Sequence, residues 1–359
     1  MAIETKNIVK VLVVDDSAFM RKVITDILNS DDEIQVIATA KNGFDALEKL
    51  KSNKPDVVTM DVEMPEMDGL TCLKEIDKLD YVPVVMLSSV TREGENATLQ
   101  ALENGAVDFI TKPVNIFDIT TVDKKMEIIE KVKVAKKAKS VKRDTKDVQI
   151  RVKSDIVKSE AVKIRNIKNI VAIGTSTGGP KALQDVIPLI PANVPAAFLV
   201  VQHMPPGFTK SLADRLNTIS EIAVKEAEHG EEIKPGYVYI APGDYHMLVD
   251  RGKDDTIRIK LTQDPHVGGH RPAVNVMMES LSDTGLNNII GVIMTGMGGD
   301  GSEGIKKLKQ INKSYIIAQD EKSCVVYGMP KVAVQTGAVD IVVPLKEISN
   351  AIMKIVGGN

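Results

Sequence analysis

Two features that the sequence of 359 residues lacks, paired cysteines and long apolar runs, narrow what the chain can be. Its only cysteines, Cys72 and Cys324, lie far apart and lack the spacing of metal ligands, which excludes a disulfide framework and argues against a zinc site. No apolar run approaches the roughly 18 residues that a transmembrane helix needs, so we expect no membrane insertion. The first residues also lack the features of a secretory signal, and the expected location is cytoplasmic.

The middle of the chain lacks the residue types that make turns and packed cores. Neither Gly nor Pro occurs between Val114 and Ile173, and no aromatic residue occurs between Phe117 and Phe198. A segment with so little to bury is typical of a solvated linker, helical or disordered.

Charge is distributed unevenly along the chain, although the net charge is only −3. Residues 1–123 hold 12 basic and 23 acidic side chains, residues 124–168 hold 16 and 6, and residues 169–359 hold 18 and 20. A basic run alone indicates a solvated spacer more often than a nucleic-acid contact, and we expect no nucleic-acid partner. We therefore predict two domains, 1–123 and 169–359, joined by a basic linker whose start can extend the last N-terminal helix.

Both flanking regions alternate short apolar runs with segments of helical periodicity, the pattern of a parallel sheet covered by helices. The N-terminal runs KVLVVDD, QVIATA, DVVTMD, PVVMLSS and DFITKP predict a flavodoxin-like domain with five parallel strands. The C-terminal runs predict a doubly wound, mainly parallel α/β domain, and an antiparallel section around residues 237–261 is compatible with the pattern. These runs are NIVAIG, AAFLVVQHM, YVYIAPGDYHMLV, NIIGVIMTG, SYIIAQD and VDIVVPL.

Acidic and polar side chains stand at the ends of the N-terminal strands. Asp15 and Asp16 follow the first strand, Asp61 ends the third, Ser88 lies in the fourth, and Lys112 follows the fifth. Functional groups gather at the carboxyl ends of open parallel sheets, and three carboxylates there can bind a hard cation such as Mg²⁺. With Lys112 offsetting charge, Asp61 can attack the phosphorus of a phosphate donor and form an acyl phosphate. Ser88 can then hydrogen-bond the phosphoryl oxygens.

Any one of these aspartates is more often a turn former or a helix cap, but that interpretation does not explain the set. The pair Asp15 and Asp16, the stretch MPEMDG after Asp61, Ser88, and KP at 112–113 together resemble the receiver domain of two-component response regulators. The resemblance covers the whole N-terminal region.

The receiver resemblance implies a phosphoacceptor and a metal site at named positions. Asp61 would accept the phosphoryl group, and Mg²⁺ would be held by Asp16, Asp61 and the backbone carbonyl of Glu63, with Asp15 nearby. It also implies an aromatic switch residue at Phe109, which without the resemblance would be interpreted simply as a core residue.

The first strand of the C-terminal region, NIVAIG, runs directly into the glycine-rich segment GTSTGGP. Gly174, Ser176 and Gly178 match the pattern G-x-S-x-G, in which small neighbours let a tight strand-to-helix turn expose a nucleophilic hydroxyl. Similar glycine turns cradle phosphates in dinucleotide-binding folds, and the turn alone favours neither interpretation.

Partners for a serine nucleophile follow two other C-terminal strands. His203 ends AAFLVVQHM and can act as general base, while Asp300, in MTGMGGDG, can orient the imidazole and stabilise its protonated form. Backbone N–H groups near Thr177 and Met297 are candidate oxyanion donors. The order Ser, His, Asp differs from that of α/β-hydrolases, so the match of Ser176 to their elbow is local.

The segment HRPAV, which precedes a helical pattern, suggests residues that line a substrate cleft. His270 and Arg271 are the candidates, since a guanidinium suits an acidic substrate surface. His266 and His270 have the spacing of metal ligands on a helix, but Gly268 and Gly269 between them oppose a helix, and we expect no metal there.

The segments GTSTGGP, VVQHMPPGF, YIAPGDYH, HRPAVNV and MTGMGGDG, in this order after a receiver domain and linker, resemble the chemotaxis protein-glutamate methylesterase (CheB) family. The likeness covers essentially the whole chain. It implies an enzyme, a serine hydrolase that cleaves γ-glutamyl methyl esters on chemoreceptors to glutamate and methanol and, in some members, deamidates receptor glutamines. The implied triad is Ser176, His203 and Asp300, with no cofactor for ester hydrolysis.

The CheB resemblance also implies regulation and partners. The unphosphorylated receiver would cover the catalytic cleft, and phosphorylation by the chemotaxis histidine kinase would relieve that block; methylated chemoreceptors would be the substrates. HRPAVNV departs from the frequent HRPSVDV at Ala273 and Asn275, which leaves the triad intact. Two alternatives differ in class: a DNA-binding response regulator, which the large, slightly acidic C-terminal region disfavours, and a non-catalytic adaptor whose glycine loop binds a nucleotide or anion.

Overall fold

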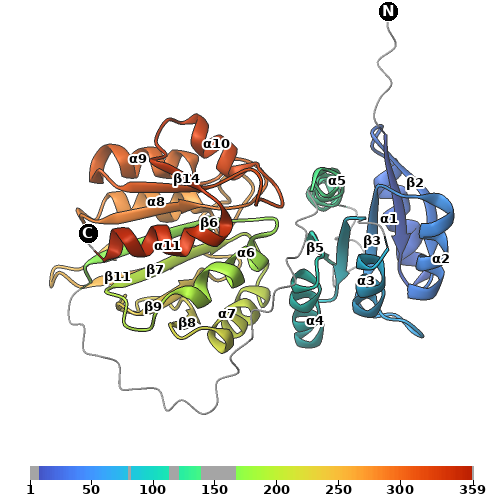
Figure 1. Ribbon diagram of the computed structural model, residues 1–359, viewed down its shortest axis with the longest axis horizontal. Coiled ribbons are helices and arrows are strands. Elements are labelled where there is room, and N and C mark those ends of the chain that lie inside the picture. Colours follow the sequence, from blue (N-terminus) through green and yellow to red (C-terminus); the bar gives the residue numbers. More distant parts are fainter. Residues whose placement is uncertain (1–7, 80–81, 113–120, 139–166, 358–359) are drawn as a thin grey trace, which may run out of the picture. The chain divides into compact units, whose positions relative to one another are not determined.

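The computed structural model describes residues 8–79, 82–112, 121–138 and 167–357. The chain folds into two compact units, Met1–Ser140 and Val141–Asn359 (Figure 1). Most of the basic segment 124–168 lies outside the described residues, and its start continues as the last helix of the first unit. None of the described helices combines the length and the apolar character that crossing a membrane requires.

The N-terminal unit is a five-stranded sheet with the strand order β2-β1-β3-β4-β5, and every neighbouring pair is parallel. This order is the flavodoxin-like one, and the predicted fold is confirmed. Its strands are β1 Val9–Val14, β2 Ile34–Ala40, β3 Val57–Asp61, β4 Val84–Ser88 and β5 Asp108–Thr111. Its helices are α1 Ala18–Asn29, α2 Gly43–Asn53, α3 Gly69–Asp77, α4 Arg92–Glu103 and α5 Val122–Lys137.

Each helix of this unit begins at a polar side chain that accepts a hydrogen bond from a backbone N–H of the first turn. Such caps satisfy N–H groups that have no partner inside the helix, and each typically contributes about 1 kcal/mol. A capping residue in the sequence thus marks the start of each of these helices. The capping residues are Ser17, Asn42, Asp68, Thr91 and Thr121.

The C-terminal unit contains a parallel seven-stranded sheet with the order β14-β13-β12-β6-β7-β9-β8, and a separate antiparallel pair, β10 and β11. The doubly wound, mainly parallel prediction is confirmed. Antiparallel pairing is found for β10 and β11, whereas β9 joins the parallel sheet. The strands are β6 Asn169–Thr175, β7 Ala196–Gln202, β8 Ala223–Glu226, β9 Tyr237–Ile240, β10 His246–Arg251, β11 Ile257–Thr262, β12 Ile289–Ile293, β13 Tyr315–Gln319 and β14 Ile341–Val343.

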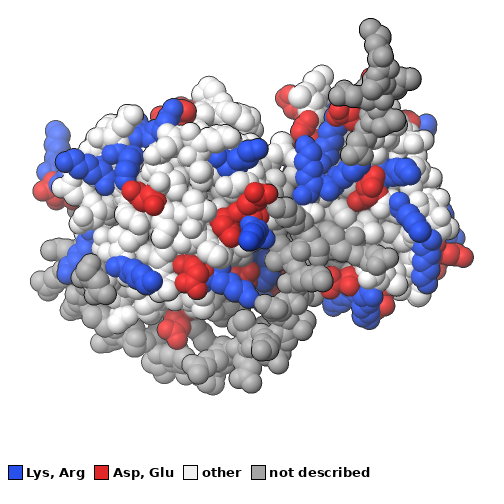
Figure 2. Space-filling view, turned by 45° about the horizontal axis from the view of Figure 1, so that its top comes forward, with Lys and Arg blue, Asp and Glu red and all other residues white. Residues whose placement is uncertain are grey.

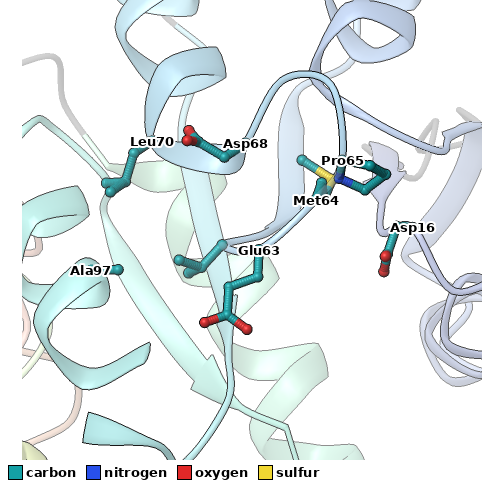
Figure 3. A pocket seen from close by; sticks show the side chains of 8 residues that line it. Asp16, Glu63, Met64, Pro65, Asp68, Leu70 and Ala97 are labelled. Carbon is teal, nitrogen blue, oxygen red and sulfur yellow. The ribbon is translucent and has the colours of Figure 1, made fainter. Parts of the chain in front are cut away.

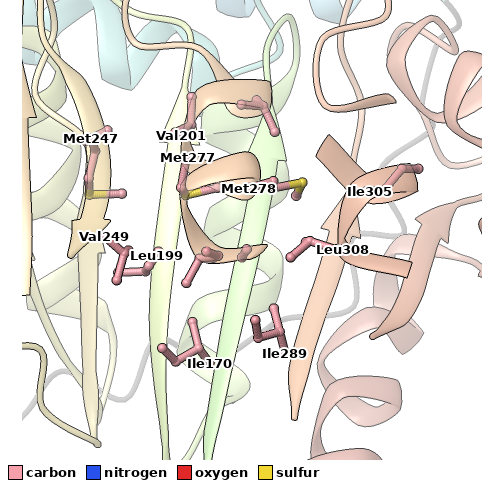
Figure 4. Packing of buried hydrophobic residues seen from close by; sticks show 14 of the residues in the cluster. Ile170, Leu199, Val201, Met247, Val249, Met277, Met278, Ile289, Ile305 and Leu308 are labelled. Atoms are coloured by element: carbon pink, nitrogen blue, oxygen red, sulfur yellow. The ribbon is translucent and has the colours of Figure 1, made fainter. Parts of the chain in front are cut away.

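Helices of the C-terminal unit cover its sheet on both faces. The buried cluster in Figure 4 shows how α8 packs: Met277 and Met278 lie among apolar side chains of β7, such as Leu199, and of α9, such as Leu308. All seven residues of β7 are buried, as a central parallel strand requires. The helices are α6 Gly179–Val186, α7 Phe208–Ile219, α8 Val274–Ser282, α9 Ser302–Asn312, α10 Met329–Gln335 and α11 Leu345–Val356, with a 3₁₀ turn, η2 Ile187–Leu189.

The strand order of the C-terminal sheet reverses at β6. The chain builds outward from β6 through β7 to β9 and β8 on one side, then returns to place β12, β13 and β14 on the other. In doubly wound sheets a crevice forms at this point, outside the carboxyl ends of the strands. The loops that follow β6, β7 and β12 therefore meet at one edge. On the face drawn in Figure 2, acidic and basic side chains are interspersed.

Candidate active site and acidic pocket

Ser176 lies in the turn between β6 and α6. Its N–H donates to the carbonyl of Thr295 at 3.0 Å, and its own carbonyl accepts from the N–H of Gly179 at 2.8 Å. Gly178 has φ +76°, where a side chain is strained, and a Cβ on Gly296 would lie 2.8 Å from the Cβ of Ser176. Glycines at these positions let the β12 loop pack directly against the serine.

His203, directly after β7, pairs with Asp300, which lies in the loop after β12. The imidazole Nε2 is 2.8 Å from Asp300 Oδ2, and both side chains are only 7% exposed. The other ring nitrogen, Nδ1, is buried and has no hydrogen-bond partner within the described residues. The predicted base and its predicted orienting carboxylate are therefore in contact.

Asp300 receives further hydrogen bonds from backbone groups at the start of α8. Its Oδ2 accepts from the N–H of Val274 at 2.6 Å, and its Oδ1 accepts from those of Asn275 and Gly301, each at 2.9 Å. Burial opposes ionisation, but the hydrogen bond and charge of His203 and the N–H groups of Asn275 and Val274 outweigh it, so the pKa of Asp300 lies below its usual value. The carboxylate stays charged beside the imidazole at neutral pH.

Of the predicted cleft residues, His270 lies against the base and Arg271 is engaged elsewhere. The rings of His270 and His203 are stacked, with centroids 3.8 Å apart. The guanidinium of Arg271 forms an ion pair with Asp244, and its Nη1 donates to two backbone carbonyls. These contacts hold the segment that carries both residues against the loop after β9.

The two residues predicted to supply oxyanion donors lie in turns beside Ser176. Thr177 is the next residue along the chain and is 7% exposed, while Met297 follows Gly296 in the loop after β12. The side-chain hydroxyl of Thr295 donates to the carbonyl of Thr177 at 3.0 Å, which links the two turns.

In the N-terminal unit, three carboxylates meet at the carboxyl edge of the sheet. Oxygens of Asp15, Asp16 and Asp61 lie within 4.8 Å of one another, and Asp15 and Asp61 are buried. Lys112 Nζ is 2.6 Å from Asp61 and 2.8 Å from Asp15. A compact set of carboxylate oxygens is the donor set that Mg²⁺ prefers, so these residues fit the predicted ion.

Burial dominates the electrostatics of this acidic cluster. It raises the pKa of Asp61 to about 6, and repulsion from Asp15 acts in the same direction, although Lys112 and the N–H of Glu63 oppose the shift. The pKa of Lys112 is also raised, because attraction to the two carboxylates outweighs its burial. Lys112 therefore does not balance the negative charge of the carboxylates, which favours binding of a divalent cation.

A hollow of about 520 Å³ opens beside the acidic cluster. Figure 3 shows Asp16 on one side of it and Glu63, Met64 and Pro65 on the loop after β3, with Ala97 of α4 opposite. Of the three clustered carboxylates, Asp16 lines this hollow.

Ser88 and Phe109, the other predicted receiver residues, are both buried. The hydroxyl of Ser88 bonds to the carbonyl of Gly94 at 3.3 Å and to the hydroxyl of Thr98 at 2.6 Å, so it faces α4. Phe109 is 3% exposed, and Lys131 Nζ of α5 lies 5.1 Å from its ring centroid.

Comparison with known proteins gives one family match in each of the two units. Residues 171–352 match the CheB methylesterase family, and residues 11–123 match the response regulator receiver domain. The protein-glutamate methylesterase/protein-glutamine glutaminase 1 of Syntrophomonas wolfei is 47% identical over 96% of this chain and 99% of its own. The corresponding Pyrococcus horikoshii protein is 47% identical over 98% of this chain and 96% of its own. The Thermotoga maritima CheB methylesterase catalytic domain, a crystal structure, has TM-score 0.51 and 45% identity over 52% of this chain and 98% of its own.

The chain belongs to the CheB methylesterase family. It is thus an enzyme of that family with a response regulator receiver domain, as the motifs predict.

Two residues that shape this CheB site were assigned no role from the sequence. Asn275 Oδ1 accepts from the N–H groups of Gly301 at 3.0 Å and Gly304 at 2.9 Å, so it caps α9 and holds the Asp300 loop. Gln202 bonds to backbone carbonyls of both Ser176 and His203. Each lies next to a recognised motif residue, which is the one signal that points to it.

Proposed function

We propose that the chain hydrolyses γ-glutamyl methyl esters of chemoreceptors to glutamate and methanol, and deamidates receptor glutamines, in chemotactic adaptation. The buried pair of His203 and Asp300 at the carboxyl edge that also carries Ser176 is the observation on which the proposal depends. The names of the relatives, which specify both activities, support it.

In the first step, Ser176 Oγ attacks the ester carbonyl carbon while His203 removes its proton. Nε2 is bound to Asp300, so Nδ1 is the nitrogen that receives the proton, and its lack of a partner within the described residues agrees with this role. Asp300 stabilises the imidazolium that forms. Backbone N–H groups of Thr177 and Met297 would stabilise the oxyanion.

In the second step, the tetrahedral intermediate collapses and the methoxy group leaves with the proton held by His203, giving methanol and an acyl-enzyme. Water then attacks the acyl carbon while His203 takes one of its protons. As the bond between the acyl carbon and Ser176 Oγ breaks, His203 returns the proton to Oγ, which releases glutamate and restores free Ser176. A glutamine side chain follows the same path with ammonia as the leaving group. The stacked His270, with Arg271 in the same segment, would border the substrate cleft.

We further propose that phosphorylation of Asp61 by a chemotaxis histidine kinase activates the esterase. Asp61 would attack the phosphorus, Lys112 would neutralise the transferred charge, and Ser88 would turn from Thr98 to the phosphoryl oxygens. Asp16, Asp61 and the carbonyl of Glu63 would hold Mg²⁺, which supplies the positive charge that this transfer requires. Phe109 would act as the switch residue that reports the change.

The proposal assigns residues 1–123 to the receiver domain, 124–168 to the linker and 169–359 to the catalytic domain. The family matches at 11–123 and 171–352 lie inside the two outer ranges and support this division.

The test is methanol release from methylated receptor fragments by the wild-type chain and by Ser176→Ala. Wild type should release methanol, and the variant should lose at least about 10³-fold of that activity, because removing the nucleophile removes the covalent path. A serine-directed phosphonate should label wild type at Ser176. If the wild type neither releases methanol nor is labelled, the non-catalytic adaptor is favoured instead.

A further inference from the structure

Gln202 is a buried amide that spans the two residues proposed as nucleophile and base. It ends β7, beside Thr175 at the end of β6, and is 2% exposed. Its Nε2 donates to the carbonyl of Ser176 at 3.0 Å and to the carbonyl of His203 at 3.2 Å. One planar group thus connects backbone segments that come from two different strands.

The orientation of this amide follows from its partners. Both groups near Nε2 are carbonyl oxygens, which only accept hydrogen bonds, so the nitrogen must face them. Oε1 in turn accepts from the hydroxyl of Thr175 at 2.5 Å. Both N–H donors and the oxygen are therefore engaged, and a flipped amide would leave buried carbonyls facing an oxygen.

Close packing fixes the position of the amide as well. A Cβ on Gly179, the first residue of α6, would lie 1.9 Å from Gln202 Oε1 and 2.7 Å from the Thr175 hydroxyl. Only glycine at this position leaves the space that the Gln202 side chain occupies. The amide, the strand end and the start of α6 are thus held as one rigid group.

We infer that Gln202 is a positioning residue, which sets the separation between Ser176 Oγ and the His203 ring through their two carbonyls. The inference rests on the proposed esterase function, because the separation matters only if these residues react together. Displacements of about 1 Å between reacting groups cost on the order of 10²-fold in rate. Loss of the amide should therefore lower kcat while leaving substrate binding largely intact.

The test uses full-length Gln202→Met, which keeps the length of the side chain without its hydrogen bonds, and Gln202→Glu, which keeps the acceptor for Thr175. Active sites are counted by phosphonate labelling of Ser176 in a parallel sample, so that kcat is expressed per site able to react. We expect kcat to fall between about 10- and 100-fold with KM within about twofold. Using both variants keeps the test valid if one of them does not fold.

Gln319→Met is the matched control. Gln319 is also a fully buried amide at the end of a strand of this sheet, but it bonds to Thr295 and Ser323 and to neither carbonyl of the reacting pair. A loss of kcat in the Gln202 variants at least fivefold larger than in the control supports the inference. Equal losses in both, or wild-type kcat in the Gln202 variants, overturn it. Failure of the wild type to release methanol or to be labelled would instead contradict the proposed function.

Discussion

Asp300 is a carboxylate whose surroundings are built for the ionised form. Four donors converge on its two oxygens: the imidazole of His203 and the backbone N–H groups of Val274, Asn275 and Gly301. Charged acceptors make stronger hydrogen bonds than neutral ones, and the set offsets the cost of burying the charge. This residue therefore contributes to stability as well as to the proposed chemistry.

Asp300→Asn should destabilise the C-terminal unit in a pH-dependent way. The folded pKa of Asp300 is lowered, so its stabilising effect is complete above its unfolded pKa of about 3.9 and is lost as the pH falls through the folded value. The variant should therefore unfold about 3 kcal/mol more easily at pH 7, and the difference should shrink below about pH 4. Urea unfolding at several pH values measures it.

Asp320→Asn provides the comparison for this prediction. Asp320 also accepts from a backbone N–H and a hydroxyl, both of Ser323, but it contacts no imidazole. The esterase activity of Asp320→Asn should stay within about threefold of wild type, whereas Asp300→Asn should lose roughly 10³-fold or more of that activity. A stability deficit of Asp300→Asn that is the same at pH 3 and pH 7 would contradict the assigned ionisation.

The sequence predicted Asp300, His203 and Ser176 because each follows a strand and carries a chemistry-bearing side chain. Gln202 and Asn275 could not be found in this way, because their role depends on which backbone atoms lie opposite them after folding. An amide beside a motif residue has many possible partners along a sequence. Its function appears only when carbonyls or N–H groups from other segments converge on it.

Helix starts differ between the two units. Those of the receiver begin at polar caps, whereas α6, α7 and α9 begin at Gly178, Gly207 and Gly301, which have positive φ and no capping side chain of their own. Small residues there let backbone segments approach the catalytic edge closely. The four-residue strand β8, AVKE, was missed because it is too short and too polar to show a period.

Lys131 couples α5 to β5 in the receiver. Its ammonium lies 3.3 Å from Asp108 and 3.5 Å from Glu127, and it also bonds to the carbonyl of Phe109. Lys131→Met keeps the apolar stem but removes the charge from these partners. We expect the receiver to lose about 2 kcal/mol of unfolding free energy, since partly buried acceptors lose their donor. Chemical denaturation followed by circular dichroism measures it.

Lys133→Met, two residues along the same helix, is the control for α5. Lys133 pairs with Asp31, whose side chain is 22% exposed, and with Glu33, whose side chain is 61% exposed, so solvent screens the second pair. Such pairs contribute about 0–1 kcal/mol, and this variant should lose less stability than Lys131→Met. If the two variants lose the same unfolding free energy, the contacts of Lys131 with β5 contribute no more to stability than the exposed ion pair does.

At the scale of the whole molecule, the alternation of strands and helices predicted both sheets, but not the strand order of the larger one. The reversal at β6 does not follow from this alternation, because a strand-helix pattern does not say on which side of the sheet the next strand is added. It is this reversal that brings the loops after β6, β7 and β12 together. The predicted triad assumed that these loops share one edge of the sheet, and the structure places the three loops there. The catalytic roles of the three residues stay a prediction.

The proposed link between the two units gives the last prediction. Methanol release should increase when a small phosphate donor and Mg²⁺ are added, between roughly 5- and 150-fold if the coupling is typical of allosteric proteins. Asp61→Asn should reduce the ratio of stimulated to unstimulated release to one, because the acceptor carboxylate is lost. Asp56, at the opposite end of β3, accepts a hydrogen bond from the N–H of Lys10. Asp56→Asn is the control and should keep the wild-type ratio. If stimulation persists in Asp61→Asn, the phosphate donor acts at another site. If the wild type shows Ser176-dependent release without any stimulation, the esterase activity is not controlled by the receiver.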